Sequence, residues 1–399
     1  MFQRVLTSKI VESAKKMPVV TVTGPRQSGK TTLVRASFPD HAYVSLETPD
    51  DRAEARQDPR GFLKRLGTRA ILDEVQKAPD LLSYIQTLVD ENNDAGQYIL
   101  TGSQNLLLME TISQTLAGRT SLFKLLPLSI AELFDRPPLD PSTLASAVPG
   151  PTAPAPARGV WETVWAGFYP RIHDKALPPT EWLADYYRTY VERDLRDILK
   201  VMNLDAFDRF VRLSAARTGQ ELNSNSLASD AGISQPTARE WLTALQVGFL
   251  VAVFPSHDVN YSRRLRKRPR LHFLDSGLVC YLLGITDPRQ LERHPLRGAI
   301  FESFVAAELC KAFESSAREP PLFFWRDATG HEIDILVDLG SRLVPVDVKS
   351  GTTVASDYLD GLKWWTGLKG NPNTGGVLVY GGNEARSREG FEIRPWFLQ

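Results

Sequence analysis

The sequence is poor in features that define several specialised classes of protein. Its 399 residues contain only two cysteines, Cys280 and Cys310, too few for a disulfide framework or a zinc cage, which favours a reducing compartment. No apolar run approaches the ~20 residues that span a bilayer. The first residues, MFQRVLTSKIVES, lack the charged-then-apolar order of a signal peptide. We therefore expect a cytoplasmic protein without a membrane partner.

Net charge is also lacking. The 47 Lys and Arg residues balance the 47 Asp and Glu residues, so a polyanion would have to be bound by a local basic patch. The composition, with 42% hydrophobic and 24% charged residues, is typical of a globular protein. At ~150 residues per domain, the length predicts about two to three domains.

Changes in the residue pattern along the chain predict where these domains lie. In residues 1–135, short β-branched runs at 19–23, 42–46, 69–73, 97–101 and 121–125 alternate with helix-like stretches, which indicates an α/β domain with a parallel sheet. Residues 136–158 contain seven prolines and little to bury, as in a flexible linker or insertion. Residues 159–256 have a helical pattern, and residues 257–399 return to strand-like runs. Three folded units are expected.

The strongest motif follows the first predicted strand. The run VVTVTGPRQSGKTT leads a β-branched strand into GxxxxGK[ST] and then into a helix-forming stretch. Two glycines bend the backbone so that N–H groups face an anion. The lysine reaches the outer phosphates and the threonine after it ligates Mg²⁺. A chance glycine turn is the alternative, but the strand-loop-helix context favours binding of ATP and Mg²⁺ by Gly24, Pro25, Arg26, Gln27, Ser28, Gly29, Lys30, Thr31 and Thr32.

Two later strands end in polar residues that suit hydrolysis of the bound nucleotide. The strand AILDE delivers Asp73, which suits the magnesium shell, and Glu74, which is placed to orient or deprotonate the attacking water. An acidic pair at a helix start is the alternative. The strand YILT ends in GSQN, where Ser103 or Asn105 would sense the terminal phosphate unless both are simple turn formers.

The N-terminal part of the chain resembles the ATPase domain of a prokaryotic family of AAA-type ATPases with a C-terminal domain of unknown function. The resemblance rests on four segments in this order: GPRQSGKTT, ILDEVQ, YILTGSQN and LAGRTSLFKLLPLSIAEL. The resemblance implies that the sensor strand lies between the P-loop strand and the acidic strand. It also implies that Arg119 is a catalytic finger for a neighbouring subunit, in a homo-oligomer or ring, although an ordinary surface arginine is the alternative. WAGFYPRI and WLADYYRTYVERDL extend the resemblance and imply a helical lid over the nucleotide.

The middle unit carries a helix-turn-helix pattern in LNSNSLASDAGISQPTAREWLTALQVGFL, residues 222–250. Gly232 occupies the turn and Ser234 caps the second helix. The buried stripe of that helix is expected at Ala238, Trp241, Leu242 and Leu245. Gln235, Thr237 and Arg239 would then face outward toward DNA, and GFLVAVF would begin a wing. A protein-docking role for the same unit stays open.

The densest charge in the chain follows this unit. RRLRKRPR spans residues 263–270 and contributes the candidate DNA contacts Arg263, Arg264, Arg266, Lys267, Arg268 and Arg270. Such a cluster would bind phosphates in a salt-sensitive, sequence-independent way. A solvated loop is the equally weighted alternative.

The C-terminal unit contains acidic residues in a nuclease-like pattern. Glu302 begins a helix with an apolar stripe, Asp334 lies in an apolar strand, and Asp347 and Lys349 share one face of the next strand. Together they resemble the PD-(D/E)XK nuclease fold, an α/β restriction-endonuclease-like domain, and three carboxylates can hold Mg²⁺ or Mn²⁺. Acidic residues at strand ends in an amphipathic hairpin are the alternative.

These patterns lead to one expected function and two alternatives. The leading hypothesis is an ATPase that binds DNA, branched or otherwise structured, and remodels or processes nucleic acid. The second is a metal-dependent DNA nuclease gated by ATP. The third is a nucleotide-switched docking scaffold with an inactive nuclease-like domain.

Overall fold

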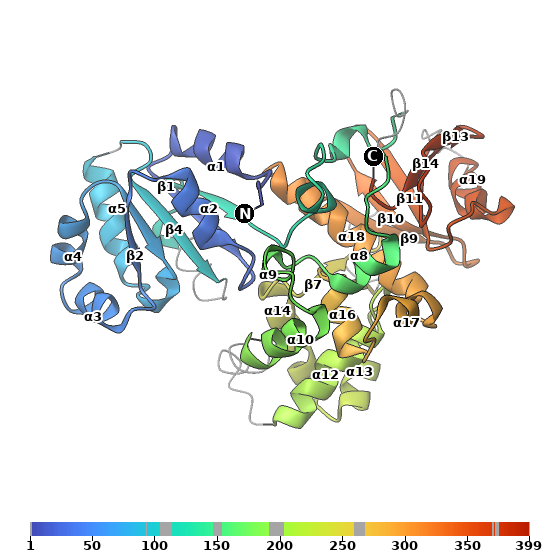
Figure 1. Cartoon of the computed structure of the whole chain (residues 1–399), viewed down its shortest axis with the longest axis horizontal. Coiled ribbons are helices and arrows are strands. Elements are labelled where there is room, and N and C mark those ends of the chain that lie inside the picture. The colour runs from blue at the N-terminus through green and yellow to red at the C-terminus, as the bar shows by residue number, and fades with distance from the viewer. Residues whose placement is uncertain are drawn as a thin grey trace. The chain divides into compact units, whose positions relative to one another are not determined.

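The computed structural model describes residues 2–92, 94–103, 114–146, 154–190, 203–258, 268–368, 371 and 375–398. The chain divides into two compact units (Figure 1). The first comprises Met1–Leu128, Val247–Phe249 and Glu314–Arg318, and the second comprises Ser129–Gln246, Leu250–Phe313 and Glu319–Gln399. The predicted middle and C-terminal segments thus fall largely within one compact unit. In the described ranges, no helix combines the length and the apolar character needed to cross a membrane.

The first unit is built on the parallel sheet that the sequence predicts. Its strands are β1 (Val19–Gly24), β2 (Ala42–Ser45), β3 (Ala70–Asp73), β4 (Tyr98–Ser103) and β5 (Thr120–Lys124), in the order β2-β3-β4-β1-β5. The P-loop strand β1 therefore lies beside β4, which separates it from the acidic strand β3, as the family resemblance implies. Because all five strands run parallel, their carboxyl ends meet at one edge of the sheet.

Both faces of this sheet are covered by helices (Figure 1). On one face, α1 (Thr7–Ala14) and α2 (Lys30–Ser37) pack against Val20 and Val22 of β1. On the other, α3 (Pro49–Gln57), α4 (Pro59–Leu66) and α5 (Leu81–Glu91) share a core with Val19. A short 3₁₀ turn, η1 (Val75–Lys77), follows β3. The burial of β1 on both faces explains its continuous β-branched run.

The helical part of the second unit contains α7 (Ile130–Leu133), η2 (Pro141–Thr143), α8 (Val160–Ala166), α9 (Pro170–Asp174), α10 (Pro179–Tyr186) and α12 (Leu204–Ala216). The helices α13 (Ser224–Ala231) and α14 (Gln235–Val247) follow in the order that the helix-turn-helix pattern predicts. A small antiparallel sheet then pairs β8 (Arg270–Phe273) with β6 (Gln220–Glu221) on one side and β7 (Val251–Phe254) on the other.

The rest of the second unit is α/β. The helices α16 (Ser276–Leu282), α17 (Pro288–Arg293) and α18 (Arg297–Ser315) precede a six-stranded mixed sheet. Its strand order is β13 (Arg386–Arg388), β14 (Phe391–Pro395), β12 (Val377–Tyr380), β11 (Leu343–Lys349), β10 (Glu332–Asp338) and β9 (Leu322–Arg326). A 3₁₀ turn, η4 (Ser356–Leu359), leads into α19 (Asp360–Thr366), whose Leu362 and Trp365 join the core on one face of this sheet.

The proline-rich segment 136–158 is tied down in part. Within its described residues, Arg394 Nη2 donates to the carbonyl oxygens of Thr143 and Ser146 at 3.3 and 2.8 Å, and Arg342 Nη2 donates to the Ser142 carbonyl at 2.6 Å. Leu144 between them is buried. The backbone carbonyls of this stretch thus accept from Arg342, which directly precedes β11, and from Arg394 of β14. The expectation of a flexible linker does not extend to this stretch.

Candidate functional site

The loop after β1 has the backbone of an anion-binding turn. β1 ends at Gly24 (φ 151°), and Gly29 (φ 95°) caps the start of α2. A Cβ atom on Gly24 would lie 2.2 Å from the Leu125 carbonyl oxygen, so the turn requires glycine there. Within the described chain, the N–H groups of residues 29–32 donate no hydrogen bond, and the buried Ser28 hydroxyl has no partner. Free donors at a helix N-terminus fit a phosphate group.

The Lys30 ammonium group lies inside this turn. It donates to the carbonyl oxygens of Gly24 and Pro25 at 3.1 and 2.9 Å, and the residue is buried. Burial lowers the pKa of Lys30 to about 8, although the nearby carboxylates of Glu74 and Asp73 favour its charged form. Since its hydrogen-bond partners are neutral carbonyls, an anionic phosphate would be a stronger partner for this charge.

Asp73 at the end of β3 accepts hydrogen bonds from three hydroxyl groups. Thr31 Oγ1 lies 3.1 and 3.0 Å from its two carboxylate oxygens, Tyr43 OH lies 2.9 Å from Oδ2, and the Thr101 hydroxyl also donates. Burial, reinforced by Asp73, raises the pKa of Tyr43 to about 12, which keeps this phenol a donor. The predicted magnesium ligands Thr31 and Asp73 thus lie side by side, with the oxygen atoms that Mg²⁺ prefers. The residues present fit both ATP and its metal ion.

Glu74 is held by the end of β4. The Ser103 N–H and hydroxyl lie 3.3 and 3.4 Å from Glu74 Oε2, and Gln76 Nε2 donates both to this oxygen and, at 2.9 Å, to the Ser103 hydroxyl. Burial favours the protonated acid, but Lys30 and these hydrogen bonds outweigh it and lower the pKa of Glu74. Glu74 is therefore an ionised carboxylate at neutral pH. Ser103 pairs in register with Gly24, while its fellow candidate Asn105 lies outside the described residues.

Arg4 supports the turn from behind and was missed by the sequence analysis. Its guanidinium group donates to the carbonyl oxygens of Ser28 and Leu126, each at 2.6 Å. These bonds join the N-terminal segment, the phosphate loop and the segment after β5. Only the tertiary fold brings them together, so no local pattern could have indicated this role. Within the loop, Arg26 Nη2 lies 3.8 Å from Glu47 Oε1.

Arg119, the proposed finger, lies at the opposite edge of the sheet from this site. It directly precedes β5, whose first residue pairs with Val19 at the start of β1. A five-residue strand spans ~16 Å, so Arg119 lies near the wrong end of the strands to serve its own site. Its Nε and Nη2 atoms donate to the two Asp90 oxygens at 2.6 and 2.9 Å. This exposed ion pair holds the Arg119 side chain against Asp90 of α5.

The candidate DNA contacts of the middle unit lie on α14. Ser234 Oγ accepts from the Thr237 N–H at 3.2 Å, as expected of a cap, and Arg239 is exposed while Gln235 and Thr237 are half-buried. The apolar stripe Ala238, Trp241, Leu242 and Leu245 is buried as predicted. Of the basic run, Arg263, Arg264, Arg266 and Lys267 lie outside the described residues, and Arg268 is exposed.

Arg270 does not face solvent, and its interpretation as a DNA contact is wrong. Its side chain is 5% exposed and its Nη1 lies 2.9 Å from Glu302 Oε1 and 3.6 Å from Asp334 Oδ1, while its Nη2 lies 3.1 Å from Glu332 Oε2. All four residues of β8 are buried, Arg270 among them, which the charge run conceals. Sequence reasoning also missed Glu332, which joins the predicted cluster at the start of β10.

The other predicted members of the C-terminal cluster converge with Asp334. Lys349 Nζ lies 3.7 Å from Asp334 Oδ2, and the Val348 N–H donates to the same oxygen at 2.9 Å. Burial and the neighbouring Asp334 raise the pKa of Asp347 to about 7, and burial raises the pKa of Glu302 well above its ordinary range. Within the described ranges, no three or more His, Cys, Asp or Glu side chains form a group that could hold a metal ion.

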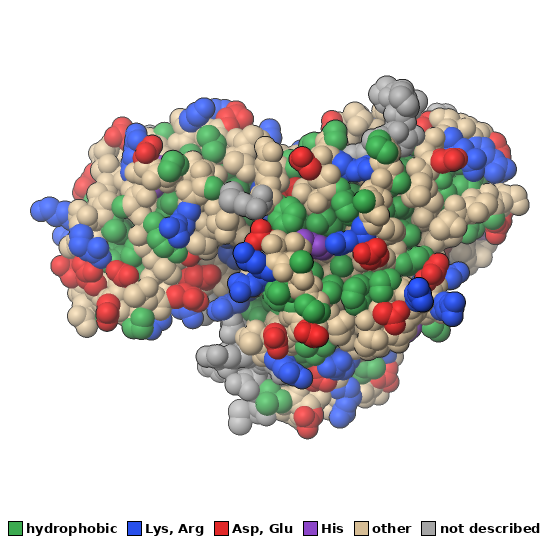
Figure 2. Space-filling model, viewed as in Figure 1, with side chains coloured by type: hydrophobic (Ala, Val, Ile, Leu, Met, Phe, Trp, Pro, Cys, Tyr) green, Lys and Arg blue, Asp and Glu red, His purple; other side chains and the backbone are tan. Residues whose placement is uncertain are grey.

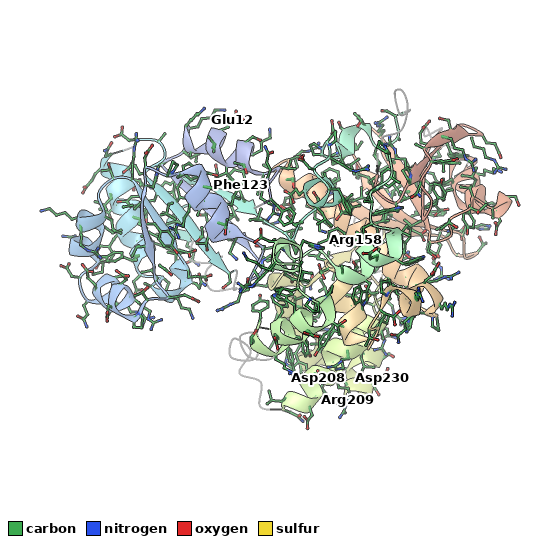
Figure 3. All side chains as sticks on the ribbon, viewed as in Figure 1. Glu12, Phe123, Arg158, Asp208, Arg209 and Asp230 are labelled. Atoms are coloured by element: carbon green, nitrogen blue, oxygen red, sulfur yellow. The ribbon has the colours of Figure 1, made fainter. Side chains whose placement is uncertain are left out.

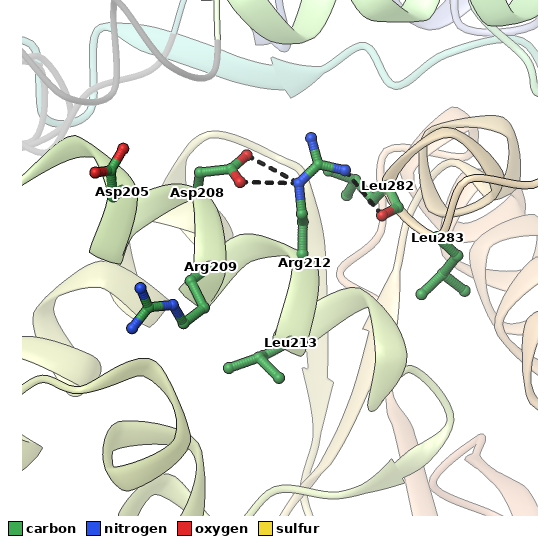
Figure 4. Close-up of a pocket in the computed structure, with 7 residues that line it drawn as sticks. All are labelled: Asp205, Asp208, Arg209, Arg212, Leu213, Leu282 and Leu283. Carbon is green, nitrogen blue, oxygen red and sulfur yellow. Dashed lines mark hydrogen bonds and ion pairs between the residues drawn. The ribbon is translucent and has the colours of Figure 1, made fainter.

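A separate open hollow of about 540 Å³ lies beside α12 (Figure 4). Two of the charged residues that line it pair with each other, because Arg212 Nε lies 3.0 and 2.9 Å from the Asp208 oxygens, and Arg212 Nη1 also donates to the Leu282 carbonyl at 3.0 Å. Arg209, labelled with Asp208 in Figure 3, donates to the Ala231 carbonyl at 3.4 Å. We assign no ligand to this hollow.

The chain matches three family models in succession. Residues 16–134 match the AAA domain, residues 157–289 match a domain of unknown function (DUF8612), and residues 297–397 match another domain of unknown function (DUF4143). Two mycobacterial proteins described as uncharacterized, Rv2008c of Mycobacterium tuberculosis and Mb2031c of Mycobacterium bovis, are each 29% identical over 354 residues. These alignments cover 88% of this chain and 74% of each relative.

Among solved structures, the Walker-type ATPase PABY2304 of Pyrococcus abyssi is 16% identical with a TM-score of 0.42, over 69% of this chain and 94% of that one. The AMPPCP-bound DnaA of Aquifex aeolicus is 14% identical with a TM-score of 0.27, over 60% and 86%. The part of the chain that matches the AAA domain, residues 16–134, contains the loop, Lys30 and Asp73 described above. These residues form an AAA-type P-loop domain.

Proposed function

We propose that this protein is an ATPase that binds DNA and uses ATP hydrolysis to remodel or process nucleic acid. The observation that supports hydrolysis most directly is the meeting of three elements at the carboxyl edge of one sheet. They are the turn that holds Lys30, the Asp73 carboxylate with its Thr31 neighbour, and the ionised Glu74. Binding, metal ligation and water activation each have a candidate residue there.

Each residue has a distinct task in this proposal. The N–H groups of residues 29–32 and the Lys30 ammonium bind and orient the phosphates, while Thr31 and Asp73 would hold Mg²⁺. When bound, that ion offsets the charge of the phosphates. Glu74, whose pKa is lowered, takes a proton from the attacking water, and Ser103 keeps the Glu74 carboxylate at the end of β4.

Arg119 supports an oligomeric form of this enzyme. Its position before β5 prevents it from reaching its own phosphate turn, but a guanidinium at a subunit surface is suited to complete a neighbour's site. In the isolated subunit, Asp90 holds it by two hydrogen bonds. We infer that assembly of a homo-oligomer transfers Arg119 from Asp90 to the adjoining nucleotide.

The DNA-binding part of the proposal is supported by the second unit. α13 and α14 carry the helix-turn-helix order, Arg239 is exposed on α14, and a basic run follows β7. On the face shown in Figure 2, basic and acidic side chains both occur across each unit. Binding would therefore depend on local cations and weaken steeply with salt. If α13 and α14 bound only proteins and no DNA, this part of the proposal would be refuted.

The test combines enzyme turnover with a panel of DNA structures. ATPase rates of the wild type, Lys30→Ala and Glu74→Gln are measured with linear, branched and single-stranded DNA, and mass in solution is recorded alongside. We expect DNA to raise wild-type turnover, Lys30→Ala to lose both binding and hydrolysis, and Glu74→Gln to bind nucleotide but not hydrolyse it. Equal turnover in all three proteins would refute hydrolysis at this site, and turnover indifferent to every DNA would remove the nucleic-acid role.

The second candidate is an ATP-gated nuclease in the C-terminal part, favoured by the convergence of Glu302, Asp334 and Lys349. DNA cleavage in Mg²⁺ or Mn²⁺ that is lost on Asp347→Ala would establish it. Without cleavage but with salt-dependent DNA binding, the ATPase proposal stands. If neither occurs, the remaining alternative is a nucleotide-switched docking scaffold.

A further inference from the structure

One arginine occupies the centre of the acidic cluster in the second unit. Arg270 of β8 contacts Glu302 of α18 and both Glu332 and Asp334 of β10, with N–O distances of 2.9, 3.1 and 3.6 Å. Two elements far apart in the sequence, α18 and β10, thus place three carboxylates around the guanidinium group that β8 carries. Two of these acids, Glu302 and Asp334, belong to the set that the nuclease resemblance assigns to a metal ion.

The guanidinium group is fixed in this position. The Arg270 side chain is 5% exposed, and its central carbon lies 4.9 Å from the centre of the Phe324 ring, which covers one face of the group. Strand pairing holds its backbone between β6 and β7. A buried arginine with several carboxylate partners is costly to remove, because its departure leaves those charges unpaired.

A metal ion and this guanidinium group compete for the same oxygen atoms. Arg270 Nη1 lies within 3.6 Å of both Glu302 Oε1 and Asp334 Oδ1. An ion bound by these two oxygens would sit ~2.0–2.6 Å from each, in the space that the guanidinium nitrogen fills. The other Asp334 oxygen accepts from the Val348 N–H at 2.9 Å and lies 3.7 Å from Lys349 Nζ. Both oxygens of Asp334 therefore already face cationic or N–H groups.

We propose that Arg270 is the resident cation of the acidic site formed by Glu302, Glu332 and Asp334. In the native protein it takes the place that a divalent metal ion would need, so this site holds no metal and does not support metal-dependent cleavage. The described carboxylates form no metal-binding group as they stand, and replacing Arg270 with a neutral residue frees them to gather around a divalent cation. This inference is independent of the ATPase activity, and it predicts that the nuclease alternative fails.

The test measures Mn²⁺ binding to the full chain without nucleotide, by the loss of the electron paramagnetic resonance signal of free Mn²⁺. All proteins carry Asp73→Asn, which removes the carboxylate among the two candidate metal ligands of the phosphate site. We compare this parent with Arg270→Gln, with the charge-conserving control Arg270→Lys, and with the double variant Arg270→Gln/Asp334→Asn. The parent and Arg270→Lys should show no Mn²⁺ site that depends on Asp334. Arg270→Gln should gain one site at least tenfold tighter than any in the parent, and the double variant should lose it.

A thermal readout separates a new site from a general loss of structure. Arg270→Gln should melt below the parent, and Mn²⁺ should raise its Tm in a concentration-dependent way, because a ligand that binds the folded state stabilises it. The parent should show no such rise.

Two results would overturn the proposal. One is an Asp334-dependent Mn²⁺ site in the parent, and the other is a folded Arg270→Gln that gains none. If Arg270→Gln does not fold, Mn²⁺ titrations of the parent, of Arg270→Lys and of Asp334→Asn test the proposal instead. A Mn²⁺ site that is present in the parent and lost in Asp334→Asn refutes the proposal. Equal Mn²⁺ binding by these three proteins supports it.

Discussion

The pH dependence of nucleotide binding is the sharpest consequence of the Lys30 environment. Burial lowers the pKa of this lysine to about 8, against the opposing effect of Glu74 and Asp73 and with a smaller contribution from Arg26. A bound phosphate restores the charged form, so only the protonated lysine binds well. The protonated fraction falls about 25-fold between pH 7.5 and pH 9.5 for a pKa of about 8. We expect ADP affinity to fall by the same factor, equivalent to about 2 kcal/mol.

The assay is titration of ADP at constant free Mg²⁺ across this pH range, with ADP chosen because it is not hydrolysed further. Lys30→Arg is the matched control, since arginine keeps its charge throughout. Its affinity will be lower than that of the wild type but should change little with pH. A wild-type affinity that changes less than threefold, or an equal slope in Lys30→Arg, would show that the Lys30 ammonium is not titrating in the empty turn.

Three further predictions concern the residues around this turn. Gly24→Ala should abolish nucleotide binding and lower Tm, because its Cβ would lie 2.2 Å from a backbone oxygen. Gly67→Ala, at a glycine that also has a positive φ (77°) but no neighbour within 4 Å, should cost only about 1 kcal/mol. Arg4→Ala should lose about 2–4 kcal/mol in urea unfolding, because it leaves two carbonyls without their charged donor, and Arg4→Lys should recover part of this. If Arg119 acts on a neighbouring subunit, Arg119→Ala should remove the concentration-dependent part of ATP turnover, and Asp90→Asn should shift its onset to lower protein concentration.

The sheet of the first unit could be predicted because its strands are buried on both faces. Burial selects continuous β-branched runs such as VVTV, and the five observed strands lie within two residues of the predicted bounds. Asp73 and Glu74 could also be assigned, since they directly follow a short apolar strand. Strand order came from the family resemblance, because no local pattern fixes which parallel strands become neighbours.

The supporting residues could not be predicted, because their contacts are distant in sequence. Arg4 and the Leu126 carbonyl are 122 residues apart, and Tyr43 reaches Asp73 across 30 residues. Arg270 shows the opposite difficulty. A dense basic run predicts side chains that face solvent or nucleic acid. This run, however, ends in the strand RLHF, whose four residues are all buried. Charge density was therefore a weaker guide to this residue than the strand that contains it.

Two acidic clusters among the described residues differ in what neutralises them, and we expect this difference to separate a ligand-binding site from one that excludes cations. In the first unit, Lys30 donates to neutral carbonyls and Asp73 accepts from neutral hydroxyls. A ligand that brings both phosphate and a divalent cation would supply the opposite charge to each. In the second unit, Glu302 and Asp334 already share the Arg270 guanidinium. A cation entering there would have to displace a buried charge, so the same residue types predict ligand binding in one unit and its exclusion in the other.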